Sequence, residues 1–129
     1  MNVPQKTVLV VEDEAPLSLV LGNALQKEGF AVLTAADGKA GLRLALEKHP
    51  DMILADLKLP IMSGVDMIRE IRKDEWGKHA RIIILTNVSH PETLGEAMEQ
   101  GAFYYFVKSD SSMQDVVAAV RSQLNHPAS

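Results

Sequence analysis

The sequence predicts a doubly wound α/β fold in which a five-stranded parallel sheet carries helices on both faces. Short apolar runs rich in β-branched residues alternate with longer stretches of helical period, which is the pattern of repeated strand–helix units. Hydrophobic residues make up 47% and charged residues 23% of the 129 residues, as in an ordinary globular domain. We therefore expect five units in a single domain over residues 1–129, with its core at about 6–124.

The first unit covers residues 7–29. A strand is expected at 7–12, and a helix begins near Pro16 because proline suits a first helical turn. Gly29 is expected to end this helix. Five apolar residues recur at helical spacing and should lie against the sheet: Leu17, Val20, Leu21, Ala24 and Leu25.

The second and third units repeat this pattern. Strands are expected at 31–35 and 51–56, each rich in apolar residues. The helix between them begins at Asp37 and ends near Pro50, and a loop at 59–64 precedes the third helix. The inward residues of these two helices are Gly41, Leu44 and Ala45, and then Val65, Ile68 and Ile71.

The last two units complete the sheet. Strands are expected at 80–86 and 102–107, and helices at about 91–100 and 113–124. The inward residues are Leu94, Ala97 and Met98, and then Met113, Val116, Val117, Val120 and Leu124. Because only five residues follow Leu124, we expect no second domain.

Polar side chains stand where four of the five apolar runs end. Glu12 and Asp13 follow the first run, Asp56 the third, Thr86 the fourth and Lys108 the fifth. Parallel strands joined by right-handed crossovers end at one edge of the sheet, so these five side chains should meet there. Helix capping is the simpler alternative and explains Asp13 or Glu14, but it does not explain Asp56 together with Thr86 and Lys108.

Such a cluster predicts Mg²⁺-dependent phosphoryl chemistry. Two carboxylates about 4 Å apart repel by about 4 kcal/mol at an effective dielectric near 20, unless a cation neutralises them. Oxygen ligands without His or Cys favour a hard cation such as Mg²⁺. A carboxylate can attack phosphorus to give an aspartyl phosphate, while Lys108 and the Thr86 hydroxyl stabilise the phosphoryl oxygens.

Composition disfavours several other classes. The net charge of −4, with no basic stripe, argues against direct nucleic-acid binding. The absence of cysteine excludes disulfides and thiolate metal sites, and it fits the cytoplasm. We find no signal peptide, no run of about 18 apolar residues and no glycine-rich phosphate loop, so neither a membrane nor a nucleotide partner is expected.

Four segments match a known family in their order and spacing: Val10-Val11-Glu12-Asp13-Glu14, then Asp51–Asp56 followed by Leu59-Pro60 and Gly64, then Leu85-Thr86, and Gly101-Ala102 through Tyr105 to Val107-Lys108. Together they resemble the receiver domains of two-component response regulators, of which the CheY-like proteins are the single-domain form. The resemblance covers nearly the whole chain. It implies the flavodoxin-like strand order 2-1-3-4-5.

The resemblance also implies roles for the acidic residues. Asp56 corresponds to the phosphoacceptor, which receives a phosphoryl group from a phosphohistidine on a sensor histidine kinase or a histidine phosphotransfer protein. Asp13 and Asp56 would bind Mg²⁺ together with the backbone carbonyl of Lys58. Glu12 would act on the metal directly or through a water molecule.

A switch is implied as well. Thr86 and Lys108 would hold the phosphoryl oxygens, and Tyr105 would follow an inward movement of Thr86. The face formed by the fourth helix, the fifth strand and the fifth helix would then exchange partners, either a downstream protein or a second copy of the chain. Self-phosphorylation and self-dephosphorylation are the only enzymatic reactions expected.

Several residues depart from the family pattern. Glu12 stands where the family often has Asp, and it keeps the charge. Ser109 replaces a proline that forms a cis peptide bond; we expect a trans bond here, because a non-proline cis bond costs about 3 kcal/mol. Lys58, Asn87 and Val88 lie at the predicted rim, where they would tune the lifetime of the phosphoryl group.

Aromatic and histidine side chains have structural expectations. The run Phe103–Phe106 should pack under the flanking helices, and the alternative is an exposed patch for a partner or for dimerisation. Trp76 should be a half-buried loop anchor. Four histidines fall at predicted loop or helix ends and should be solvated: His49, His79, His90 and His126.

Two other functions remain open. One is a Mg²⁺-dependent phosphohydrolase with an aspartyl nucleophile, similar to the haloacid dehalogenase group, and turnover of small phosphomonoesters would favour it. That group has a DxD motif and a cap domain, whereas Asp13 is followed here by Glu14 and Ala15. The other is a receiver-like scaffold that binds partners without phosphorylation, which the complete cluster argues against.

Overall fold

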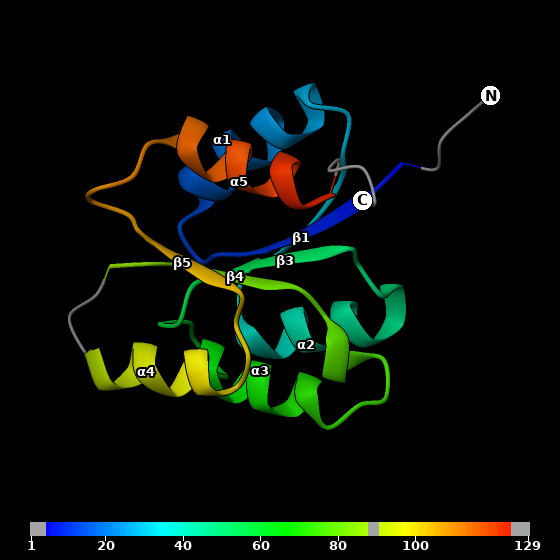
Figure 1. Cartoon of the computed structure of the whole chain (residues 1–129), viewed down its shortest axis with the longest axis vertical. Helices are drawn as coiled ribbons and strands as arrows, with labels where there is room; N and C mark the ends of the chain where they lie inside the picture. Colours follow the sequence, from blue (N-terminus) through cyan, green and yellow to red (C-terminus); the bar gives the residue numbers. More distant parts are fainter. Residues whose placement is uncertain (1–4, 88–90, 125–129) are drawn as a thin grey trace.

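A computed structural model describes residues 5–87 and 91–124 and has the predicted α/β architecture (Figure 1). Five parallel strands form one sheet in the order β2-β1-β3-β4-β5, which confirms the predicted strand order. The elements are β1 (Thr7–Val11), α1 (Ala15–Lys27), β2 (Ala31–Ala35), α2 (Gly38–Lys48), β3 (Met52–Ala55), α3 (Gly64–Arg72), η1 (Gly77–His79), β4 (Ile82–Thr86), α4 (Pro91–Glu99), β5 (Tyr104–Val107) and α5 (Met113–Leu124).

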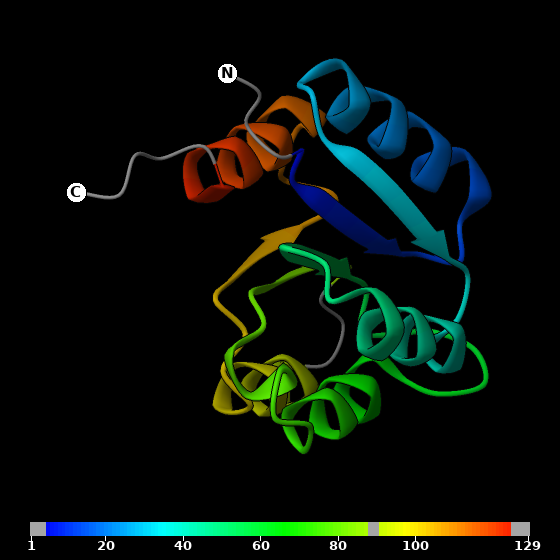
Figure 2. The same ribbon diagram turned by 90° about the vertical axis from the view of Figure 1, so that its right-hand side faces the viewer.

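Helices cover both faces of the sheet. Helices α1 and α5 lie on one face, and α2, α3 and α4 lie on the other, as Figures 1 and 2 show from two directions. Each face has its own hydrophobic cluster. The sheet is therefore the middle layer of three, and the central strands are buried on both sides.

The alternation of side chains along each strand explains the two clusters. Val8 and Val10 of β1 pack against α1 and α5, whereas Leu9 and Val11 pack on the opposite face. Successive side chains of a strand point to opposite faces, so a strand that is buried twice must be apolar throughout. This accounts for the uninterrupted apolar run Ile82–Leu85 in β4.

Polar residues begin two of the helices at the expected places. The Asp37 carboxylate accepts a hydrogen bond from the Ala40 N–H at 2.7 Å, and the Ser63 hydroxyl accepts one from the Asp66 N–H at 3.1 Å. Both satisfy N–H groups that have no partner within the helix. The predicted start of the helix at Asp37 is confirmed.

One predicted core position on α1 is wrong. Val20 was expected to face the sheet, but it is 53% exposed. The buried residues of this helix are Leu21, Gly22 and Leu25, so the face that packs on the sheet is centred between the directions of Leu21 and Gly22. Each residue turns the helix by about 100°, which places the Val20 side chain away from this face and towards solvent.

The predicted packing of the aromatic run is also wrong. Phe103, Tyr104 and Tyr105 are 53%, 50% and 40% exposed. Strand β5 is an edge strand, and its four residues are exposed or only partly buried. The alternative, an exposed aromatic patch, is what the structure has.

Strand starts and loops differ from the prediction in detail. Strands β3, β4 and β5 begin one or two residues later than predicted, because Asp51 and Phe103 each donate one backbone hydrogen bond to a neighbouring strand without continuing the ladder. The short helix η1 was not predicted.

Two local predictions are confirmed. Trp76 is half-buried, as expected. The described residues contain no cis peptide bond, so the Lys108–Ser109 bond is trans as predicted.

Arg72, at the end of α3, ties the helical layer to the sheet. Its guanidinium donates hydrogen bonds to four backbone carbonyl oxygens at 2.7–2.9 Å: those of Gly77, Ala80, Gln100 and Gly101. Burial lowers the pKa of Arg72. We call this arrangement the Arg72 clamp.

Candidate functional site

The carboxyl ends of the strands bring the predicted residues to one edge of the sheet. Glu12 and Asp13 directly follow β1, Asp56 follows β3 and Lys108 follows β5, while Thr86 is the last residue of β4. Backbone hydrogen bonds fix neighbouring ends: the Asp56 N–H donates to the Val11 carbonyl at 3.1 Å. The Lys108 N–H donates to the Thr86 carbonyl at 2.9 Å.

Lys108 joins the acidic residues across the sheet. Its Nζ lies 2.7 Å from Glu12 Oε1, 2.8 Å from Asp56 Oδ2 and 3.2 Å from Glu14 Oε2. The side chains of Lys108, Glu12 and Asp56 are 11%, 2% and 8% exposed. An ammonium held this way offsets the mutual repulsion of the carboxylates.

Burial and neighbouring charges shift the pKa values of Glu12 and Lys108 in opposite directions. Burial raises the pKa of Glu12, and the hydrogen bond from Lys108 only partly offsets this effect. For Lys108, burial alone would lower the pKa, but hydrogen bonds and attraction to Asp56 and Glu12 outweigh burial and raise the pKa. The lysine therefore carries its charge at neutral pH.

Three carboxylates form a group that fits a metal ion. Glu12, Asp13 and Asp56 each offer one oxygen, and these oxygens all lie within 4.8 Å of one another. Glu12 and Asp56 are buried, while Asp13 is exposed. A hard cation with several water ligands suits such a partly open set of oxygens.

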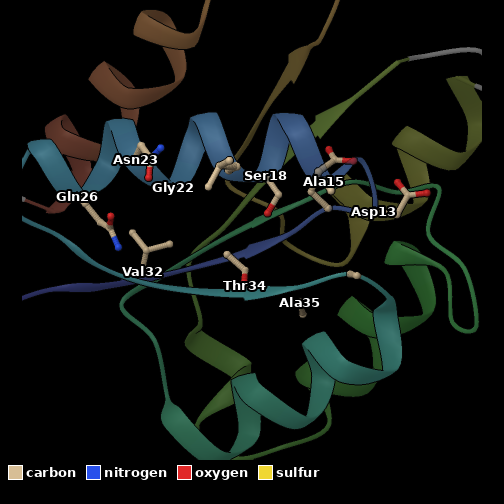
Figure 3. A pocket seen from close by; sticks show the side chains of 12 residues that line it. Asp13, Ala15, Ser18, Gly22, Asn23, Gln26, Val32, Thr34 and Ala35 are labelled. Atoms are coloured by element: carbon tan, nitrogen blue, oxygen red, sulfur yellow. The ribbon is translucent and has the colours of Figure 1, made fainter.

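A groove gives solvent access to the exposed side of this group. It lies between α1 and β2, has a volume of about 600 Å³ and includes Glu12 and Asp13 in its lining. Figure 3 shows Asp13 at the end of α1 where the groove meets the acidic residues, with Ser18 and Thr34 further along. A hydrated ion can therefore reach Asp13 from solvent on this side.

The loop after β3 holds Asp56 firmly. Asp56 Oδ1 accepts a hydrogen bond from the Lys58 N–H at 3.2 Å, and the Gly64 N–H donates to the Leu57 carbonyl at 2.7 Å. A Cβ atom on Gly64 would lie 2.2 Å from the Asp56 carbonyl oxygen. Only glycine allows this close approach, which explains Gly64 in the sequence motif.

The same loop carries an unusual residue. Ile61 has φ +71° and is 79% exposed. A β-branched residue rarely adopts this left-handed backbone, which costs about 1–2 kcal/mol. The loop beside Asp56 is therefore strained at a position that contributes little to the core.

The remaining predicted residues lie around the cluster. Thr86 is buried, with 4% exposure, Lys58 and Asn87 are exposed, and Tyr105 is 40% exposed on β5. Val88, together with His90 and His126, lies outside the described residues. The assigned roles of all these residues stay predictions.

The contact of Glu14 with Lys108 was not predicted. Helix capping was the role considered for Glu14, and it is the N-cap residue of α1, although its side chain makes no capping hydrogen bond. Its carboxylate reaches Lys108 from the N-terminal side of α1, and its N–H donates to Glu12 Oε2 at 3.1 Å. The signal was present, because Glu14 belongs to the same acidic segment as Glu12 and Asp13. A third acid next to one lysine indicates that the cluster carries excess negative charge.

Comparison with known proteins identifies the family. The sequence profile of the response regulator receiver domain matches residues 8–121. The chain belongs to this family. The receiver domain is 34% identical over 124 residues to the DNA-binding response regulator MtrA of Mycobacterium tuberculosis, covering 96% of this chain and 53% of MtrA. It spans about half the length, or less, of several curated relatives.

Solved structures agree with this assignment. The receiver domain matches the chemotaxis response regulator CheY4 of Vibrio cholerae with a TM-score of 0.85 at 28% identity, covering 94% of this chain and 100% of CheY4. It also matches the receiver domain of the sensor histidine kinase PA1611 of Pseudomonas aeruginosa with a TM-score of 0.82 at 28% identity, covering 92% and 96%. The PA1611 structure has a magnesium ion coordinated in its active-site cleft.

These matches make the chain a receiver domain of two-component signalling. Membership in this family leaves no support for the haloacid dehalogenase type of phosphohydrolase. Within residues 5–87 and 91–124, no helix has the length and apolar character needed to cross a bilayer.

Proposed function

We propose that this receiver domain accepts a phosphoryl group on Asp56 in a Mg²⁺-dependent reaction. The observation that carries the proposal is the position of Asp56. Asp56 and Glu12 are the two residues of the carboxylate group that also contact Lys108. Asp56 has its Oδ2 2.8 Å from Nζ, its Oδ1 accepts a hydrogen bond from the Lys58 N–H, and it is the less deeply buried of the two.

Glu12 is the less suitable nucleophile. Its side chain is 2% exposed, against 8% for Asp56, and burial raises its pKa, which favours the neutral form over a nucleophilic carboxylate. Asp56, at the end of the central strand β3, is placed for attack on a phosphorus atom.

Transfer would proceed by displacement at phosphorus. A carboxylate oxygen of Asp56 forms the new P–O bond while the P–N bond of a donor phosphohistidine breaks, and the imidazole nitrogen keeps the electron pair. Lys108 passes its contact from the carboxylate to a phosphoryl oxygen. The Thr86 hydroxyl donates a hydrogen bond to another phosphoryl oxygen.

Glu12, Asp13, Asp56 and the backbone carbonyl of Lys58 would hold the Mg²⁺ ion. When bound, the ion would supply positive charge that offsets the carboxylates and the phosphoryl oxygens. The fit of three carboxylate oxygens within 4.8 Å supports this set. The magnesium ion in the cleft of the PA1611 receiver domain supports the same choice of metal.

The proposed partners fall into two groups. A sensor histidine kinase or a histidine phosphotransfer protein would dock at the Asp56 edge as phosphoryl donor. A downstream protein or a second copy of the chain would bind the face of α4, β5 and α5 after phosphorylation. The exposed aromatic side chains of Phe103, Tyr104 and Tyr105 on this face support such a docking role.

The test is intact-mass measurement after incubation with acetyl phosphate and Mg²⁺. The wild-type chain should gain the mass of one phosphoryl group, while Asp56→Asn should gain none. Asp66→Asn removes an exposed carboxylate on α3, away from the site, and should be labelled like the wild type.

Two further variants separate the roles within the site. Asp13→Asn should remain unlabelled at low Mg²⁺ and recover labelling at high Mg²⁺, because it retains the nucleophile but loses a metal ligand. Thr86→Ala should be labelled more slowly. Equal labelling of Asp56→Asn and the wild type would reject Asp56 as the acceptor, and an unlabelled wild type would reject phosphoryl acceptance itself.

A further inference from the structure

A second pocket lies at the opposite end of the sheet from Asp56. It has a volume of about 350 Å³ and is formed where the central strands β1, β3 and β4 begin. The strands place it roughly 15 Å from the Asp56 edge, at about 3.3 Å per residue. The side chains that matter here are Lys6, His49, Asp51, Trp76, His79 and Arg81.

The charged side chains of this pocket give it a positive balance. Lys6 and Arg81 are cationic, Asp51 is the one acid in the lining, and His49 and His79 add imidazole groups. Asp51 Oδ2 already accepts a hydrogen bond from the Thr7 N–H at 2.8 Å. In a chain with a net charge of −4, a pocket with the opposite sign is suited to an anion.

The cationic groups keep donors available for a ligand. Among the described residues, the Lys6 and His79 side chains have no hydrogen bond or ion pair. Arg81 Nη1 donates to the Gln123 carbonyl at 2.8 Å, which anchors the guanidinium to the end of α5. Its other N–H groups have no partner within residues 5–87 and 91–124. An anchored guanidinium loses less entropy when it binds an oxyanion.

His49 is held in an unusual conformation at the pocket wall. Its backbone is left-handed, with φ +47° and ψ +60°, and its ring stacks on Trp76 with a centroid distance of 4.5 Å and an interplanar angle of 7°. A left-handed residue other than glycine costs about 1–2 kcal/mol and persists where its surroundings hold it. The stack thus fixes an imidazole in the wall of the pocket.

We propose that this pocket binds the phosphate group of a small molecule. Lysine and the planar guanidinium of arginine are the usual partners of phosphate oxygens, and imidazole N–H groups add donors. The site uses side chains rather than a glycine-rich loop. It does not depend on phosphoryl acceptance at Asp56, and the phosphate can come from inorganic phosphate or from a nucleotide whose base lies against the aromatic pair.

Trp76 is the single tryptophan of the chain and provides a local signal. Asp56→Asn, without Mg²⁺, is titrated with inorganic phosphate, AMP and adenosine while Trp76 fluorescence is recorded. Phosphate and AMP should each give a saturable change, and adenosine should give none. Equal affinities for phosphate and AMP assign the site to inorganic phosphate, whereas tighter AMP binding assigns it to a nucleotide.

Charge-matched variants test the assigned residues. Lys6→Gln with Arg81→Gln should weaken phosphate binding tenfold or more, since charge-assisted hydrogen bonds each contribute about tenfold. Lys39→Gln with Arg43→Gln, on the exposed side of α2, removes the same charge and should leave binding unchanged. Lys6→Gln with His79→Gln affects only side chains that have no partner in the described part of the chain. It should also weaken binding, and it avoids disturbing the Gln123 contact.

Three results would overturn the proposal. One is the absence of a saturable change up to about 10 mM phosphate and AMP. A second is adenosine binding as tight as AMP binding. A third is equal weakening by the pocket variants and by the α2 control, which would mean that only the overall charge matters.

Discussion

Lys108 and Arg72 are both partly buried cations, but their surroundings differ. The Lys108 ammonium lies among the carboxylates of Glu12, Asp56 and Glu14. The Arg72 guanidinium lies among four neutral backbone carbonyls. The pKa of Lys108 is raised by its partners, whereas burial lowers the pKa of Arg72.

The difference separates a reactive site from a structural one. A cation among carboxylates can exchange one anion for another, so the proposed movement of Lys108 from Asp56 to a phosphoryl oxygen would leave it with charge partners throughout. The neutral carbonyls around Arg72 offer no such exchange of anions. We therefore expect the stabilisation from the Lys108 contacts to change when Mg²⁺ is added, and the stabilisation from the Arg72 clamp to stay the same.

Removing the Arg72 clamp should have the largest effect. Arg72→Ala removes the guanidinium donor from four carbonyl groups, of which that of Gly77 keeps the Ala80 N–H. It should lower the free energy of unfolding by about 3–4 kcal/mol, measured by urea denaturation. Mg²⁺ should not restore this loss. Arg43→Ala, at an exposed position of α2, serves as the control and should change stability by less than about 0.5 kcal/mol; a similar loss in both variants would contradict the clamp.

Removing the Lys108 charge should have the next largest effect. Lys108→Met leaves Glu12 and Asp56 buried without their cation and should cost about 2 kcal/mol in the absence of divalent ions. Mg²⁺ should recover part of this loss, because it neutralises the same carboxylates. Lys48→Met, on the exposed end of α2, should show neither effect. If Mg²⁺ recovered none of the stability lost in Lys108→Met, the expected difference between Lys108 and Arg72 would be contradicted.

Glu12 should make stability depend on pH. Its folded-state pKa is raised above the usual 4.5, so the folded chain binds this proton more tightly than the unfolded chain does. Its contribution to stability is therefore greatest below pH 4.5 and falls as pH rises through the raised pKa. Lys108 adds no slope in this window, because its raised pKa lies above its usual 10.5.

The variant Glu12→Gln tests this sign. Its free energy of unfolding, compared with that of the wild type, should improve steadily between about pH 4 and pH 7. Chemical denaturation at a series of pH values measures the difference. A wild-type chain that gains stability over the variant as pH rises would contradict the raised pKa.

The smallest effect is expected from two left-handed positions, one in contact with Arg72 and one in the loop after Asp56. Gly101, whose carbonyl binds Arg72, has φ +89°, whereas Ile61, in the loop after Asp56, has φ +71°. Ile61→Gly should raise the free energy of unfolding by about 1 kcal/mol, and Gly101→Ala should lower it by about the same amount. Thermal unfolding measures both, and a destabilised Ile61→Gly would show that the Ile61 side chain contributes more than its backbone costs.

Much of the fold could be predicted because each strand carries its own signal. Apolar runs gave the five strands and their order of appearance, and the carboxyl-edge rule brought Glu12, Asp13, Asp56, Thr86 and Lys108 to one edge of the sheet. These inferences need only the periodicity of side chains and the handedness of the crossovers. The roles of the site residues remain to be tested by the experiments above.

The wrong predictions concern residues whose burial depends on how neighbouring elements pack against them. Val20 and the Phe103–Tyr105 run are apolar, and periodicity alone cannot tell how far a helix rotates or which strand lies at an edge. The Glu14 contact with Lys108 and the four carbonyls around Arg72 depend on side-chain reach between segments far apart in the sequence. Such contacts leave little trace in a local pattern.

The pairing of β4 with β5 places Thr86 opposite Val107 and joins the Lys108 N–H to the Thr86 carbonyl. The relative positions of Thr86 and Lys108, the two residues assigned to the phosphoryl oxygens, are therefore fixed by backbone pairing between β4 and β5. They do not depend on the helix that connects these strands. Insertions or deletions in that helix can reshape the surface seen by partners while the reaction centre is preserved. The choice of partner and the proposed phosphoryl chemistry can thus change independently as the sequence of this domain evolves.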